Sequence, residues 1–199
     1  MDMPMPIDVT GKVKGFFLKP SATFRATRTE SLSIAFQYYV ILSIIYSVLV
    51  FIVFAVTFTA FPGVISGLLP PGFGIELSLY LAFLLFVIHL YGVFLSGLAY
   101  HVFVILFGGK EGVVQTIKTV MYASTPDLLL GWIPIVSAAG AVWTLILIII
   151  GIRENQEMPL GRSFWVAVIP VVLYLISAFL GVLVLIAFRR ARLRALTGI

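Results

Sequence analysis

The chain has 199 residues, of which 61% are hydrophobic and 11% are charged, and its mean hydropathy is +1.16. Soluble globular domains do not reach these values, so the composition indicates an integral membrane protein built as one bundle. The formal charge of +5 could suggest nucleic acid, but the basic residues flank apolar runs, where they set membrane orientation. We therefore expect no nucleic-acid partner, and the lack of cysteine excludes disulfides and thiolate chemistry.

Residues 1–33 form a basic, aromatic arm ahead of the first apolar run. Phe16, Phe17, Leu18 and Phe24 alternate with cations, so we expect the rings to enter the headgroup boundary while the cations meet anionic lipid. Each near-surface charge contributes about 1 kcal/mol to such binding. A solvated arm that only enforces orientation is the alternative, compatible with the first. The candidate lipid-headgroup contacts are Lys12, Lys14, Lys19, Arg25 and Arg28.

Two long runs without Asp, Glu, Lys or Arg follow, at 34–60 and 77–107. Each exceeds the roughly 20 residues that a membrane-spanning helix needs. Between them, 61–74 holds three prolines and four glycines, which predicts a tight non-helical connection on the far side of the membrane. Glu76 stands where the second helix begins, which suits the helix dipole and needs no further role.

The pattern weakens at 113–131 before it recovers at 135–152 and 165–188, and the chain ends in an arginine-rich tail, 189–199. The interrupting residues are Gln115, Lys118, Ser124, Thr125 and Asp127. If 113–131 crosses the bilayer, the protein is an all-α bundle of five spans whose third helix is short and broken at Pro126. If 127–152 crosses alone, it has four spans.

The two topologies differ in where the tail lies. Five spans put nine Lys and Arg inside and four outside, whereas four spans put eleven inside and two outside. Because cytoplasmic loops carry an excess of Lys and Arg, charge counting alone favours four.

The stretch YASTPDLLLGWIP allows two interpretations. In one it is a kink or helix start near the membrane surface, in which Thr125 caps a new helix, or Ser124 and Thr125 cover the carbonyl that Pro126 leaves free. In the other it is a broken helix whose backbone ends and Asp127 carboxylate bind an ion or headgroup. The candidate residues of this break are Tyr122, Ser124, Thr125, Pro126, Asp127, Trp132 and Pro134.

Three other polar residues lie within apolar segments. His89 and His101 are twelve positions apart, about 18 Å along a helix and about 120° around it, so they cannot share a metal ion. We expect each to form a hydrogen bond to another helix or to face the interface. Lys118 is expected to reach the cytoplasmic interface rather than to pair with Asp127.

Small residues spaced by four predict close helix packing. They occur as Gly92 with Ser96, Ser137 with Ala141, and Ser177 with Gly181. A homo-oligomer is compatible with this pattern.

The arm sequence FFLKPSATFRATR, together with YASTPDLLLGWIP and the later LILIIIGIREN, resembles the Yip (Ypt-interacting protein) membrane domain family over about residues 16–188. The resemblance implies five transmembrane helices and a cytoplasmic amino terminus. Eukaryotic members act in vesicle trafficking and bind prenylated small GTPases. The arm here has only about 30 residues, shorter than theirs, and resembles a prokaryotic, archaeal-type member, so a GTPase partner does not carry over.

The sequence contains no glycine-rich phosphate loop, zinc motif or acid pair at helical spacing within a span, so we expect no enzyme, cofactor or metal. We predict an integral membrane protein, of the cell membrane in a prokaryote, that organises membrane or serves as an adaptor through anionic lipids and a cytoplasmic protein partner. The candidate partner loops hold Lys110, Glu111, Arg153, Glu154 and Glu157. The alternative is a small transporter or channel that uses the break at 124–134 with Asp127.

Overall fold

The computed structural model describes residues 7–61, 63 and 74–197, with the side chains of 193–197 left aside. The regular elements in these ranges are all helices. They are α1 (Val9–Leu18), α2 (Pro20–Thr27), α3 (Leu32–Ala60), α4 (Gly74–Leu106), α5 (Val113–Ala123), α6 (Thr125–Leu130), α7 (Val136–Asn155) and α8 (Leu160–Thr197). Most of the predicted proline–glycine connection lies outside the described residues.

Four of the described helices, α3, α4, α7 and α8, are long and apolar enough to cross a membrane. They cover four of the five predicted spans. The serine before α3 explains where that helix begins, because the Ser31 hydroxyl accepts a hydrogen bond from the Ile34 amide. Glu76 lies in the first turn of α4, as predicted from the helix dipole.

The fifth predicted span, 113–131, is two short helices, α5 and α6. The break covers its own freed carbonyl: Pro126 has no N–H for the carbonyl of Tyr122, and the Thr125 hydroxyl donates to that oxygen instead at 2.6 Å. Thr125 therefore does not cap α6, whose N-cap is Ser124. The predicted break is confirmed, and its cap is corrected.

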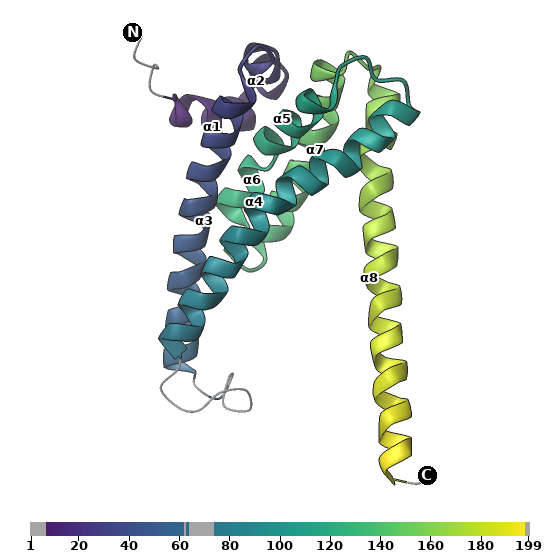
Figure 1. Cartoon of the computed structure of the whole chain (residues 1–199). Helices are drawn as coiled ribbons and strands as arrows, with labels where there is room; N and C mark the ends of the chain where they lie inside the picture. The colour runs from purple at the N-terminus through teal and green to yellow at the C-terminus, as the bar shows by residue number, and fades with distance from the viewer. Residues whose placement is uncertain (1–6, 62, 64–73, 198–199) are drawn as a thin grey trace.

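The chain reverses direction at Gly131–Ile135, between α6 and α7, and returns alongside α6 (Figure 1). At this reversal Gly140 of α7 lies so close to α6 that a Cβ there would come within 3.2 Å of the Pro126 carbonyl oxygen. Ile135 takes a φ of 73°, which a β-branched residue rarely adopts. Residues 127–152 are therefore not one continuous helix but part of α6, a turn and most of α7.

Figure 1 shows the two ends of the chain at opposite ends of the molecule. The loops α4–α5 and α7–α8 lie at the same end as α1 and α2, and α8 runs to the other end. This alternation is the one expected when α5 and α6 together make a third, shorter pass between α4 and α7.

The last helix, α8, contacts α4 and α7 near the charged end and then stands apart from them (Figure 1). None of its apolar window is buried within the chain. A Cβ at Gly181, or at Gly92 of α4, would meet nothing within 4 Å. The predicted small-residue pairs at these two positions are therefore not packing faces within one chain.

Phe16 and Phe24 of the arm are part of the core, which corrects the expectation that these two rings enter lipid. Phe16 and Phe24 are both 0% exposed and their ring centroids lie 4.9 Å apart. α2 packs on α7, where Gly151 makes room: a Cβ there would lie 2.7 Å from the Phe24 Cζ atom. Burial of two aromatic side chains contributes a few kcal/mol each and fixes the arm on the bundle.

Candidate functional site

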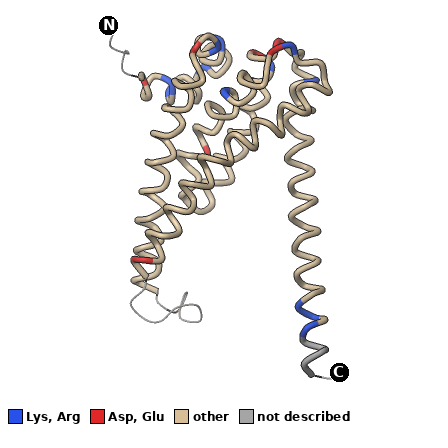
Figure 2. Tube along the Cα trace, viewed as in Figure 1, with Lys and Arg blue, Asp and Glu red and all other residues tan. Residues whose placement is uncertain are grey.

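Charged side chains gather at one end of the molecule, as Figure 2 shows. They come from α1, α2, the α4–α5 loop, the end of α7 and the α7–α8 turn. We call this charged end of the molecule the cap. A second basic group lies on the last turns of α8 at the opposite end. The cap contains most of the residues that the sequence marked for lipid or partner contact.

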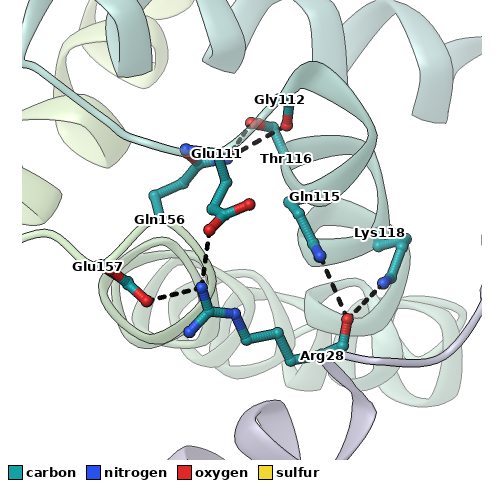
Figure 3. Close-up of polar contacts among 8 residues, drawn as sticks. All are labelled: Arg28, Glu111, Gly112, Gln115, Thr116, Lys118, Gln156 and Glu157. Atoms are coloured by element: carbon teal, nitrogen blue, oxygen red, sulfur yellow. Dashed lines mark hydrogen bonds and ion pairs between the residues drawn. The ribbon is translucent and has the colours of Figure 1, made fainter.

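Arg28 is the centre of the cap (Figure 3). Its Nη2 atom donates to Glu111 at 2.9 Å and to Glu157 at 2.8 Å. Glu111 belongs to the α4–α5 loop and Glu157 to the α7–α8 turn, so one guanidinium joins the arm to both connections. The predicted partner loops are thus held by the chain's own arm.

Two side chains of α5 bind the backbone carbonyl of Arg28. Its carbonyl oxygen accepts from Lys118 Nζ at 2.8 Å and from Gln115 Nε2 at 3.2 Å (Figure 3). Lys118 is 3% exposed, and its ammonium is bound to this carbonyl rather than to Asp127. The carbonyl lies at the end of α2, where a cation suits the helix dipole.

Gln156, which is 0% exposed, ties the two connections together. Its side-chain oxygen accepts from the Glu111 amide at 3.0 Å, and its Nε2 atom donates to the Thr116 hydroxyl at 3.0 Å. The same hydroxyl is 2.9 Å from Nδ1 of His101. This contact confirms the prediction that His101 bonds to another helix, whereas His89 bonds to Leu85 of its own helix.

A second polar group lies under the arm. Lys12 and the Tyr122 hydroxyl both contact Oε2 of Glu30, and the Lys12 ammonium lies 5.3 Å from the Tyr122 ring centroid. The ring of Tyr122 stacks on Phe16 with centroids 5.4 Å apart. Lys12 is therefore engaged within the protein and is not a free headgroup contact.

Electrostatics of the cap follow from these ion pairs. The hydrogen bond from Arg28 lowers the pKa of the exposed Glu157 carboxyl, and the same bond raises the pKa of the Arg28 guanidinium. Both groups are therefore charged at neutral pH. Because Glu157 is exposed, solvent screens the pair, and its role is to orient the loops.

The remaining arm cations, Lys14, Lys19 and Arg25, are exposed. Arg25 lies 3.6 Å from Glu154, while its side chain stays 65% exposed. Arg153 bonds to Ser21 of α2 at 3.0 Å and to Glu154. Lys110 keeps an exposed side chain in the α4–α5 loop.

The structure separates the predicted break into two places. Tyr122 and Thr125 are buried between the arm and α3, where Thr125 Oγ1 lies 2.9 Å from the Tyr38 hydroxyl oxygen. Asp127 lies in the first turn of α6 and Trp132 in the turn after it, and α6 lies further from α1 and α2 than α5 does along the direction of α3 (Figure 1). The Ser124 hydroxyl donates to the carbonyl of Val120, and Pro134 is exposed.

Sequence reasoning missed the polar partners inside the cap. Asn155, 1% exposed, donates to Thr119 at 2.8 Å, and Gln156 makes the bonds given above. The available signal was the polar pair Asn155–Gln156 directly after a long apolar run, opposite three polar positions of α5.

The fold and the cap together define the class of protein: it is a polytopic helical membrane protein with a folded, charged cap at one end. The Yip1 domain family matches residues 14–182, and the chain belongs to that family. The match begins within the arm and ends within the last predicted span, 165–188. Searches of curated proteins and of solved structures found no match. No group of His, Asp and Glu side chains suited to a metal ion occurs among the described residues.

Proposed function

We propose that this Yip-type protein is a non-enzymatic membrane organiser or adaptor that acts through its cap on the cytoplasmic side. The observation that carries the proposal is the bonding of Arg28 to Glu111 and Glu157, which turns the arm and two loops into one surface. A surface fixed in this way loses little conformational entropy when it binds a partner or a membrane.

The cytoplasmic placement of the cap is supported by charge. Nine of the thirteen Lys and Arg lie in the arm, the α4–α5 loop, α5, the last turn of α7 and the first turn of α8, and four lie in the tail. Because the chain has no cysteine, single cysteines at positions 14 and 192 can be labelled selectively in sealed vesicles. An impermeant maleimide should modify Lys14→Cys and Arg192→Cys from opposite sides. Labelling of both from the same side would contradict the orientation.

Anionic lipid is the first proposed contact of the cap. Lys14, Lys19 and Arg25 are exposed, and Leu18 is 77% exposed beside them. Cations near a membrane surface attract anionic headgroups at about 1 kcal/mol each, and an exposed leucine adds apolar contact.

This contact can be tested in nanodiscs that mix anionic and zwitterionic lipid. We expect anionic lipid to be enriched around the protein and the enrichment to fall when Lys14, Lys19 and Arg25 are changed to Gln. The matched control changes Arg189, Arg190 and Arg192 to Gln, which removes the same charge from the other end. An unchanged enrichment in the arm variant would contradict the lipid role.

A protein partner is the second proposed contact of the cap. It would bind through the exposed side chain of Lys110 and the Arg28–Glu111 ion pair. Cross-linking from a photoreactive residue at position 110 should yield a defined adduct in membranes of the native cell. The adduct should be lost in Arg28→Ala, which removes the ion pairs from the arm to both loops, and kept in the tail variant. Equal adduct from Arg28→Ala would show that the folded cap is not required.

Transport is the second candidate, because the Asp127 carboxylate has no hydrogen bond or ion pair with any described residue. Solute flux into liposomes that falls in Asp127→Asn would favour transport over the adaptor role. Absence of flux together with a working cap would leave the adaptor role in place.

A further inference from the structure

A small cavity lies between α3, α4 and the end of α6, away from the cap. Its volume is about 120 Å³, and three aromatic side chains line it: Tyr46 and Phe54 from α3, and Trp132 from the turn after α6. The indole N–H of Trp132 donates to the Leu129 carbonyl at 2.8 Å, which fixes the ring. Gly131 and Leu85 also line the cavity.

The carboxylate of Asp127 lies beside this cavity. Its Oδ1 atom is close to Gly131, where an added Cβ would come within 3.2 Å of it. Tyr39, Tyr46 and His89 lie within electrostatic range of the carboxylate. None of them donates a hydrogen bond to it among the described contacts, because Tyr39 donates to the His89 carbonyl and His89 Nδ1 to that of Leu85.

Among the described residues no Lys or Arg pairs with Asp127, and His89 is the basic side chain within electrostatic range of its carboxylate. The described cation nearest along the sequence is Lys118, whose ammonium is bound to the Arg28 carbonyl in the cap. An ionised carboxylate at membrane depth is costly unless a cation pairs with it. A cation supplied from outside would lower this cost by pairing with Asp127.

The lining rings restrict which cation fits. Aromatic faces attract organic cations such as methylated ammonium groups, and carboxylates add charge-assisted contact. A bare inorganic ion prefers several oxygen ligands, whereas the cavity is lined by three rings, aliphatic side chains and a glycine.

The cavity is separated from the cap by α5 and α6, and α3 continues beyond it to Ala60. Trp132, which lines it, is a residue type that prefers the membrane interface.

We propose that Asp127, with the rings of Tyr46, Phe54 and Trp132, forms a binding site for an ammonium group, borne by a lipid headgroup or by a small free amine. The site is independent of the cap and of the adaptor function. Binding does not require that the ligand cross the membrane.

Trp132 provides a direct readout. In a background with Trp143→Phe and Trp165→Phe, the remaining tryptophan lies in the site, and the background must keep the native thermal unfolding. The protein is placed in nanodiscs of phosphatidylglycerol, which carries no ammonium, and titrated with tetramethylammonium or choline. We expect a saturable change in Trp132 emission. The neutral analogue of choline, with carbon in place of nitrogen, should give none.

Substitutions of the acid and of one ring test which residues bind the ammonium group. Asp127→Asn should weaken binding about tenfold or more, and Tyr46→Leu should weaken it several-fold, because cation–π contacts contribute less than the charge pair. The matched control, Glu76→Gln, removes an acid from the first turn of α4 and should leave binding unchanged. Circular dichroism and thermal unfolding show whether each variant is folded, and a misfolded Asp127→Asn is replaced by Asp127→Ser.

Two outcomes would overturn the proposal: an equal response to the neutral analogue, or unchanged affinity in folded Asp127→Asn. Repetition in phosphatidylethanolamine distinguishes the source of the ammonium. A weaker apparent affinity there identifies a lipid headgroup that already occupies the site, and an equal affinity identifies free amines as the ligand. Neither result depends on partner or lipid binding at the cap.

Discussion

The cap and the outer half of α8 are stabilised in different ways. In the cap, two short helices that are too small to be stable alone are held by buried rings, ion pairs and hydrogen bonds to two loops. The outer half of α8 continues without burial in the chain, because lipid supplies the apolar surroundings and the helix satisfies its own amides.

This difference shows where specificity is encoded. Along α8, most apolar side chains face outward, so exchange of one for another changes little within the protein. In the cap, each buried polar atom depends on a particular partner, and a change at one residue leaves another unsatisfied. The following substitutions test that contrast in matched pairs.

Phe24→Ala should have the largest effect. The ring is fully buried against Phe16 and Gly151, and loss of a buried phenylalanine destabilises by about 3–5 kcal/mol. Thermal unfolding in detergent should show a large fall in Tm. The control is Phe179→Ala on α8, where the ring is 64% exposed, and its Tm should stay near that of the parent protein.

Gly151→Ala should follow. The added Cβ would lie 2.6 Å from Thr119 Cγ2 and 2.7 Å from Phe24 Cζ, and overpacking of this kind costs about 1–3 kcal/mol. Gly181→Ala adds the same atom where nothing lies within 4 Å, so it should not lower Tm. Equal Tm changes in the two variants would show that α2 does not pack on α7.

Gln156→Leu removes the amide but keeps the volume. The Glu111 amide and the Thr116 hydroxyl then lose a partner, at a cost of about 1–3 kcal/mol. Gln37→Leu is the control, because Gln37 is exposed and its side chain bonds only to Ser33. Urea-induced unfolding in mild detergent should separate the two variants, and overlapping curves would contradict the bridging role of Gln156.

Acidification should have the smallest effect. The pKa of Glu157 lies below its ordinary value of 4.5 in the folded protein, so its pairing with Arg28 is fully present above the unfolded pKa. The contribution is lost as the pH falls through the folded pKa. Proteolysis at the arm should therefore accelerate below about pH 4. In Glu157→Gln this acceleration should be smaller than in the parent protein. Identical pH profiles of proteolysis in the two proteins would exclude the Arg28–Glu157 pair as its cause.

The transmembrane part of the fold could be predicted because its signal is composition. Four predicted spans coincide with α3, α4, α7 and α8 to within a few residues at most ends, and Pro126 marks the break in the third pass. α8 extends past its predicted end, because helix continues through the arginine-rich tail to Thr197.

The cap could be predicted only in part. Arg28 and Glu157 were marked as candidates by their charge, but their pairing links positions 129 residues apart, which no local pattern contains. Phe16 and Phe24 were assigned to lipid because alternating rings and cations suit an interface. The small residue that instead buries Phe24 is Gly151, on a helix far away in the sequence.

The central claim is that the amino-terminal arm is a folded part of the protein, and hydrogen–deuterium exchange of the full chain in nanodiscs tests it most directly. The account predicts that amides of α1 and α2 are protected at a level comparable to α5, and that Phe24→Ala removes protection from the arm before the bundle. Exchange of the parent arm at the rate of an unstructured peptide, with α5 still protected, would contradict it.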